Sequence, residues 1–166
     1  IGVVLQDVFL YNSSILDNIT LGNDSIQLNE VIQSAKKVGI HKFIDQLPGG
    51  YLYEVKERGG VLSSGQRQLI SFLRAFVYKP QILILDEATS SVDSASEELI
   101  QKATVEITKG RTSIIIAHRL STIKNADCIV VMDNGKVIEK GSHNELIALK
   151  GHYLDLYENQ FLEQKK

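Results

Sequence analysis

The sequence lacks several features that would define other classes of protein. Among its 166 residues there is one cysteine, Cys128, which excludes an internal disulfide framework and a cysteine-based zinc cluster. Apolar runs such as 82–85 and 129–132 are only a few residues long, whereas a membrane-spanning helix needs roughly 20 apolar residues. Neither sign of charge prevails, because the net charge is −2. A surface built mainly to hold nucleic acid or anionic lipid is therefore not expected.

What is present is the composition of an ordinary globular domain, with 43% hydrophobic and 23% charged residues. Short apolar stretches alternate with helical patterns, which predicts an α/β fold with a mainly parallel sheet. The expected strands are 2–5, 81–85, 112–116, 128–132 and 136–139. The expected helices are 28–38, 41–46, 64–78, 94–108, 142–149 and 152–161. Between residues 13 and 78 only helices are expected, so this stretch is predicted to be an all-helical insertion.

The first predicted strand begins at once, after Ile1 rather than a methionine. We therefore expect the chain to be a piece of a longer polypeptide.

A buried strand that ends in Asp86 and Glu87 is the first candidate site. Ligands of open α/β sheets lie at the carboxyl ends of the strands. A carboxylate there can hold Mg²⁺, directly or through water, and the next residue can polarise an attacking water. Acidic residues in a solvated loop after a strand are also common, so the pair alone leaves both interpretations open.

The segment 62–68 precedes a long apolar helix and forms the second candidate. Unpaired N–H groups at a helix start bind phosphate oxygens. Ser63 adds a hydroxyl donor, and Gly65 allows a ligand to approach the backbone. An ordinary serine N-cap explains the same residues and, taken alone, is the commoner case.

Two further polar residues follow predicted strands. His118 comes after 112–116 and could hydrogen-bond a phosphate, although a structural histidine is the commoner case. Gln6 follows the first strand, where it could contact a metal ion or water.

Taken together, these motifs resemble the nucleotide-binding domain of ATP-binding-cassette (ABC) transporters. Gln6 is similar to the Q-loop residue, 62–66 to the signature motif, 82–87 to Walker B with its catalytic glutamate, 88–93 to the D-loop, and His118 to the H-loop histidine. The segments 53–60, 117–123 and 131–136 resemble those of exporters. The resemblance covers nearly the whole chain.

The resemblance implies a P-loop NTPase (RecA-like) ABC ATPase core with an all-helical signature subdomain. Residues 1–12 would carry the Q-loop strand, 13–78 the signature subdomain, and 79–166 the rest of the core.

The resemblance also implies the chemistry. ATP and Mg²⁺ would be the bound groups, with Asp86 and Gln6 at the metal and Glu87, His118 and Gln6 in catalysis. The nucleotide of a partner domain would be contacted by five residues: Ser63, Ser64, Gly65, Gln66 and Asp93.

Two departures from the family pattern stand out. Ser64 replaces the first glycine of the signature, and serine is small enough for a phosphate still to approach. No G-x-x-x-x-G-K-[ST] motif occurs anywhere, so the phosphate-binding loop (Walker A) is missing. The chain therefore resembles the C-terminal part of an ABC domain, and the isolated chain is expected to be inactive as an ATPase.

The implied partners are a second nucleotide-binding domain in a head-to-tail dimer and the transmembrane domain of the same transporter, with no nucleic acid. The implied location is the cytoplasmic face of the cell membrane, with this piece itself soluble. The alternatives are a soluble ABC ATPase of DNA repair or chromosome maintenance, and a non-hydrolysing regulatory ABC domain. No long heptad stretch separates Gln6 from Ser63, which weighs against the ATPase of DNA repair or chromosome maintenance. Both Glu87 and His118 are present, which weighs against the non-hydrolysing regulatory domain.

The missing segment also affects stability. In the family's sheet the phosphate-loop strand lies between the strand that leads to His118 and the strand that contains Cys128. Without it, we expect these two strands to pair with each other, the chain to associate with a second copy, or the piece to be partly ordered. Association is the outcome we expect first.

Overall fold

The computed structural model describes residues 1–56, 59–86, 94–117 and 120–163, and the chain forms two compact units, 1–116 and 117–166. The predicted division into 1–12, 13–78 and 79–166 is a functional one and stays a prediction.

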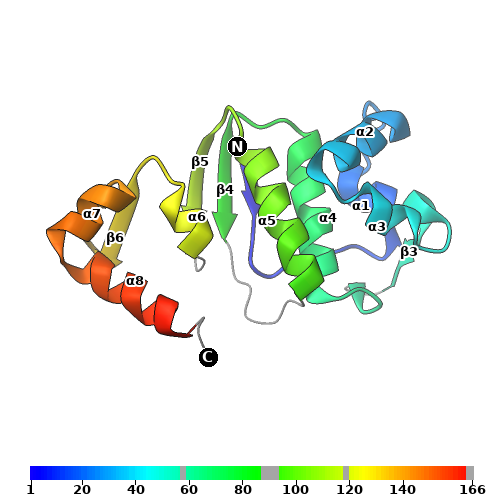
Figure 1. The fold of residues 1–166 in the computed structure, drawn as a ribbon. Helices are drawn as coiled ribbons and strands as arrows, with labels where there is room; N and C mark the ends of the chain where they lie inside the picture. Colours follow the sequence, from blue (N-terminus) through cyan, green and yellow to red (C-terminus); the bar gives the residue numbers. More distant parts are fainter. Residues whose placement is uncertain (57–58, 87–93, 118–119, 164–166) are drawn as a thin grey trace. The chain divides into compact units, whose positions relative to one another are not determined.

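The first unit contains a three-stranded parallel sheet in the order β1-β4-β5 (Figure 1). Its strands are β1 (Gly2–Val4), β4 (Ile82–Asp86) and β5 (Thr112–Ile116). In register, Val4 lies beside Leu85, and Asp86 lies beside Ile116. The parallel α/β arrangement predicted from the sequence is therefore confirmed, and all three carboxyl ends meet at one edge of the sheet.

Helices pack against one face of this sheet because every second residue of β4 at this face is apolar and buried. Leu83 and Leu85 are at most 2% exposed. They pack with α4 (Ser64–Val77) and α5 (Ser94–Thr108), which lie side by side in Figure 1. Burial of such a side chain contributes about 1.5–3 kcal/mol, so this face anchors the unit.

The segment between β1 and α4 is mainly helical, as predicted, and contains one unforeseen ladder. Its helices are α1 (Ile15–Thr20), α2 (Leu28–Val38), α3 (His41–Asp45) and the 3₁₀ turn η1 (Gly50–Leu52). Strands β2 (Ser13–Ser14) and β3 (Glu54–Val55) pair antiparallel. The insertion is therefore not strictly all-helical. A two-residue strand carries too short a pattern to be distinguished from a loop in the sequence.

The second unit is a β-hairpin with helices. Strand β6 (Ile129–Asp133) pairs antiparallel with β7 (Lys136–Gly141) around Asn134 and Gly135, whose φ angles are 47° and 74°. Positive φ at both turn positions is what an Asn-Gly hairpin requires, as the sequence predicted. The helices are α6 (Leu120–Lys124), α7 (His143–Leu149) and α8 (His152–Glu163).

A small apolar cluster holds the second unit together. Val131, Leu146 and Tyr153 are buried with Ile123, Ile129 and Ile147 against them. Cys128, which its small apolar character would place in a core, is exposed instead and lies just before β6. Among the described residues, no helix is long and apolar enough to cross a membrane.

The opposite face of the β1-β4-β5 sheet is apolar and uncovered. Val3, Ile114 and Ile116 are 51%, 57% and 52% exposed, and parallel sheets are normally covered on both faces. Strand β5 lies at the edge of this sheet, with β4 as its hydrogen-bonded neighbour.

We predict that the isolated chain associates through this face and the edge of β5. Replacing Ile114 by lysine should shift the chain toward the monomer, because a charge cannot be buried cheaply between two sheets. Val105→Lys on α5 is the matched control, since Val105 is 55% exposed but lies on a helix. Sedimentation velocity at several concentrations measures the effect. A wild-type chain that sediments as a monomer throughout would refute the prediction.

Candidate functional site

The carboxyl edge of the parallel sheet brings two predicted site residues into one region. Asp86 ends β4 and is half-buried, and Gln6 comes two residues after the end of the neighbouring β1 and is exposed. Because Val4 and Leu85 are register partners, both residues lie at the same edge of the sheet. Topology thus brings together a carboxylate and an amide that are far apart in the sequence.

This pair of side chains fits a magnesium ion better than a transition metal. Mg²⁺ prefers oxygen ligands, keeps several waters and needs only one or two protein side chains. Among the described residues no group of three His, Cys, Asp or Glu could hold a metal ion, so a site here would depend on Asp86, Gln6 and water. The described part of the chain offers no dedicated all-protein metal cage.

Ser63 is the N-cap of α4 and forms a capping box with Gln66. Its Oγ accepts a hydrogen bond from the Gln66 backbone N–H at 3.2 Å, and Gln66 Oε1 accepts one from the Ser63 N–H at 2.9 Å. The simpler interpretation of this serine is therefore correct. It does not exclude the functional one, because the hydroxyl proton of Ser63 is not used by the cap and its side chain is exposed.

The rest of the signature segment shapes the helix start around this cap. Gly65 is buried, whereas Ser64 and Gln66 are half-buried. The exposed Ser63 hydroxyl therefore stands at the positive end of a helix of 14 residues. Such an end attracts an anion, which is what the phosphate interpretation of this segment requires.

Arg67 fixes the loop that leads into this cap. Its Nη1 donates to the carbonyl of Leu62 at 2.7 Å and to that of Gly59 at 3.5 Å. Gly59 has φ of 71°, and a Cβ there would lie 2.8 Å from Arg67 Cδ. Glycine is therefore required at this position both by the backbone and by the close approach of the arginine.

Three predicted site residues, Glu87, Asp93 and His118, lie outside the described residues. Their roles stay predictions from the sequence.

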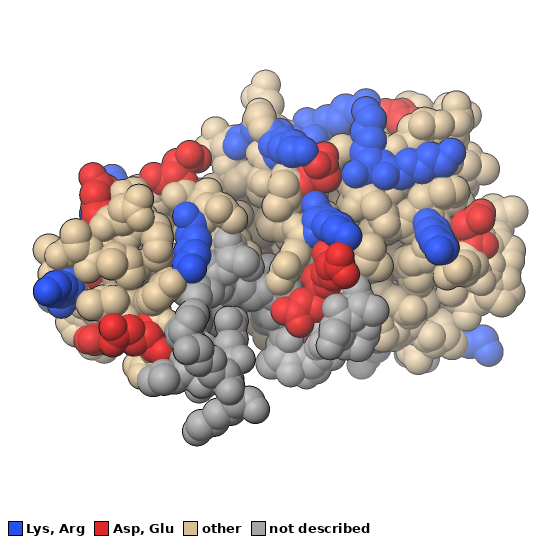
Figure 2. All heavy atoms as spheres, in the orientation of Figure 1, with Lys and Arg blue, Asp and Glu red and all other residues tan. Residues whose placement is uncertain are grey.

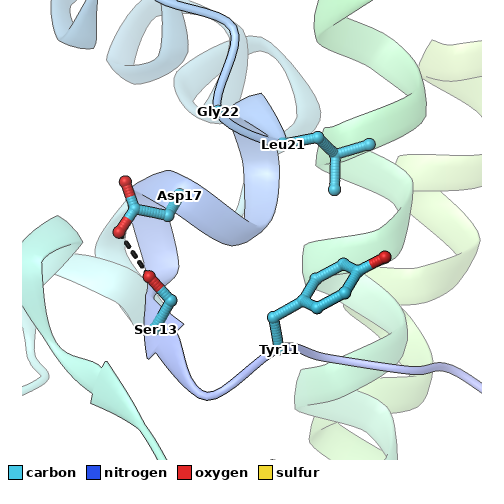
Figure 3. Close-up of a pocket in the computed structure, with 5 residues that line it drawn as sticks. All are labelled: Tyr11, Ser13, Asp17, Leu21 and Gly22. Atoms are coloured by element: carbon cyan, nitrogen blue, oxygen red, sulfur yellow. Dashed lines mark hydrogen bonds between the residues drawn. The ribbon is translucent and has the colours of Figure 1, made fainter.

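A groove that the sequence did not indicate lies a few residues beyond Gln6. It has a volume of about 310 Å³ and is lined by Tyr11, Ser13, Asp17, Leu21 and Gly22. In Figure 3 the Tyr11 ring and the Leu21 side chain extend to one side, and Ser13 and Asp17 lie on the other. Tyr11 and Leu21 are 56% and 50% exposed, so the groove has an open apolar wall.

The polar side of the groove carries a negative charge. Ser13 Oγ donates to Asp17 Oδ2 at 2.5 Å (Figure 3). This hydrogen bond, with a second from Ser14, keeps the pKa of the Asp17 carboxyl below its usual value. Asp17 is therefore ionised at neutral pH, and the groove joins an apolar wall to an anionic one.

The sequence signal for this groove was present but weak. Phe9 and Tyr11 are two aromatic residues close together in a loop, with their rings packed edge to face at 5.1 Å. Exposed aromatic residues in a loop indicate a contact surface only once their exposure is known, and the sequence does not give it.

Comparison with known proteins identifies the family. A family model described as "ABC transporter" matches residues 1–90. The chain is 54% identical over 148 residues to the alpha-hemolysin translocation ATP-binding protein HlyB of Escherichia coli O6:H1, covering 89% of this chain and 21% of that protein. It is 47% identical over 156 residues to a fatty acid ABC transporter ATP-binding/permease protein of Mycobacterium tuberculosis, covering 94% and 25%.

A solved structure shows the same fold. This structure, of a bacterial Atm1-family ABC exporter with ATP bound, superposes with a TM-score of 0.84 at 42% identity and covers 96% of this chain and 28% of that chain. The chain spans about a quarter of the length of the relatives it matches. On these grounds the chain belongs to the ABC transporter family, as part of an exporter-type nucleotide-binding domain.

Proposed function

We propose that the full-length protein hydrolyses ATP to drive export across a membrane and that this chain supplies the hydrolytic half of the site. The observation that carries the proposal is the meeting of Asp86 and Gln6 at one sheet edge. The cytoplasmic side of the cell membrane is the corresponding location. The relatives' names favour an exporter over an ATPase of DNA repair or a regulatory domain. On the face in Figure 2 acidic and basic side chains are mixed, which also fits a protein that does not bind nucleic acid.

The chain's own residues would have separate roles in metal binding and in catalysis. Asp86 and Gln6 would hold a Mg²⁺ ion largely through water, and the ion would neutralise charge on the ATP phosphates. Glu87 would orient the attacking water and accept its proton, and His118 would donate a hydrogen bond to the terminal phosphate. The phosphate-binding loop is missing from the sequence, so the isolated chain should not turn over ATP.

The signature segment would act on a second nucleotide-binding domain. Ser63 and Gly65, with Ser64, Gln66 and Asp93 nearby, would contact ATP bound mainly by the phosphate loop of the partner domain. Two domains would therefore meet head to tail, each completing the site of the other. The exposed Ser63 hydroxyl at the start of α4 supports this role.

The groove at Tyr11 and Leu21 would receive the transmembrane domain of the same transporter. Several relatives are named as combined ATP-binding/permease proteins. The apolar wall suits a short amphipathic helix, and the ionised Asp17 suits a basic residue on that helix. The groove begins at Tyr11, so one short stretch of chain connects it to Gln6 at the proposed metal site.

The proposed catalytic base is tested by Glu87→Gln in the full-length protein. An amide keeps the shape of the side chain but cannot accept the proton of water, so turnover should fall at least about 100-fold while ATP binding is retained. Glu98→Gln is the control, because Glu98 pairs with Lys102 on the surface of α5. Phosphate release and nucleotide binding are measured in parallel, with the isolated chain as a blank. Normal turnover in Glu87→Gln would remove this residue from the proposed role.

The proposed phosphate contact is tested by Ser63→Asp. Aspartate is as good an N-cap as serine, so the helix and the melting temperature should be preserved. Its charge would oppose a phosphate, and the rate of ATP hydrolysis should fall about tenfold or more. Ser63→Asn is the matched control, since asparagine caps a helix as well as aspartate but carries no charge.

In a linked dimer with Ser63→Asp in one half, the damage should appear at the site whose phosphate loop belongs to the other half. Damage confined to the mutated half's own loop would contradict the head-to-tail arrangement.

The proposed docking groove is tested by Leu21→Asp. Leu21 has φ of 50° at the end of α1, a conformation that aspartate tolerates, so the fold should survive. A second carboxylate beside Asp17 should weaken docking and lower transport-coupled hydrolysis about tenfold. Val105→Asp, an equally exposed position on α5, serves as the control. Unchanged coupled hydrolysis in Leu21→Asp would show that the membrane domain docks elsewhere.

A further inference from the structure

A fully buried asparagine organises the backbone of the groove. Asn18 is 0% exposed. Its Oδ1 accepts a hydrogen bond from the Tyr11 N–H at 2.7 Å, and its Nδ2 donates to the carbonyls of Tyr11 and Ser14, both at 3.0 Å. One side chain thus satisfies both backbone groups of Tyr11 and ties that residue to the start of α1. The groove wall at Tyr11 is therefore held as part of α1 rather than as a free loop.

Helix α4 holds the same segment from the other side. Arg74 Nε donates to the Asn18 carbonyl at 2.8 Å, and Arg74 Nη2 donates to the Phe9 carbonyl at 3.3 Å. One turn further along, the Tyr78 hydroxyl donates to the Thr20 carbonyl at 2.5 Å. These three bonds join residues more than 50 positions apart in the sequence and attach the groove to the C-terminal half of α4.

The opposite end of α4 carries the signature cap. Arg74 lies eleven residues after Ser63, which is about 16 Å along a helix at 1.5 Å per residue. Arg67, seven residues before Arg74 and hence on nearly the same side of the helix, binds the loop carbonyls of Leu62 and Gly59. The same helix is thus hydrogen-bonded to the backbone of the groove through Arg74 and to the signature loop through Arg67.

We propose that Arg74, with Asn18 as its anchor, is a positioning residue that couples occupancy of the groove to the placement of Ser63. A helix that enters the groove would press on Tyr11 and Leu21, and the backbone carbonyls of Phe9 and Asn18 would carry the displacement to α4 through Arg74. This inference rests on the proposed roles of the groove and of Ser63, and it adds the physical connection between them.

Arginine suits this task because one guanidinium can bond two carbonyls in a fixed geometry. Burial of the side chain lowers the pKa of Arg74 below its usual value, which reflects the cost of holding a charge there. A helix that needed only apolar packing would not need this charge. Leucine or methionine would fill the space without desolvating a guanidinium.

The test compares Arg74→Met, Arg74→Lys and Lys79→Met in the full-length transporter reconstituted in lipid. Methionine keeps much of the apolar stem but removes both donors, whereas lysine keeps the charge and can reach one carbonyl. Lys79→Met is the matched control, because it removes an exposed charge just after α4 that pairs with Glu30 rather than with the groove. The rate constant kcat and the KM for ATP are measured per amount of folded protein.

Arg74→Met should lower kcat about tenfold or more, because the loss of even one of its two charge-assisted hydrogen bonds from the active arrangement corresponds to a factor of about ten. The KM for ATP should stay within about twofold, since no proposed nucleotide contact has changed. Arg74→Lys should recover a large part of the rate, and Lys79→Met should equal wild type. A wild-type kcat in Arg74→Met, or equal losses in all three variants, would overturn the proposal.

A double variant separates this proposal from the docking assignment. If Leu21→Asp and Arg74→Met act on one path, the double variant should lose no more than the larger single loss. Losses that multiply would show two independent effects and overturn the coupling role. If Leu21→Asp lowers kcat and Arg74→Met does not, only the coupling role is wrong. If Leu21→Asp has no effect, the docking assignment fails, and the coupling role fails with it.

Discussion

The burial of α4 is the constraint on which the first unit depends. Leu69, Ile70, Phe72 and Leu73 are at most 1% exposed, and the helix contacts β1, α1, α2 and α5. A helix surrounded in this way carries a broad apolar stripe. Several of its polar groups bind a partner inside the fold, although the Nε2 of the buried Gln68 has none among the described residues. Arg67 and Arg74 find backbone carbonyls, and Ser63 finds the first turn of the helix.

This constraint explains how one helix can serve two sites. Apolar packing fixes the position of α4 within the core, and the two arginines fix the loops at either end of it. Removal of a buried donor leaves its acceptor unsatisfied at a cost of about 1–3 kcal/mol. Removing either arginine would therefore destabilise the loop that it holds by a free energy of this order.

Much of this arrangement follows from the sequence because its signals are local. The periodic pattern and the terminal residues place α4, α5 and α7 to within a residue or two, and Asn134-Gly135 places the hairpin. Asp86 and Gln6 follow from the rule that ligands lie at strand ends. The helix α1 and the β2–β3 ladder were missed because six-residue and two-residue elements carry almost no periodicity. The groove and the contacts of Arg74 were missed because they join segments that only the tertiary fold brings together.

The pairing of β1 with β4 also determines how late one step of folding can occur during synthesis. Gly2 lies beside Leu83, so β1 cannot pair with β4 until the whole helical segment and α4 have been made. At a synthesis rate of about 5–20 residues per second, this wait lasts roughly 4 to 16 seconds. During that time the apolar strand residues Val3 and Val4 lack their β4 partner. The helices between β1 and β4 contact one another at short sequence separation and can form first. The strand β1, rather than these helices, is therefore the part that completes its contacts late.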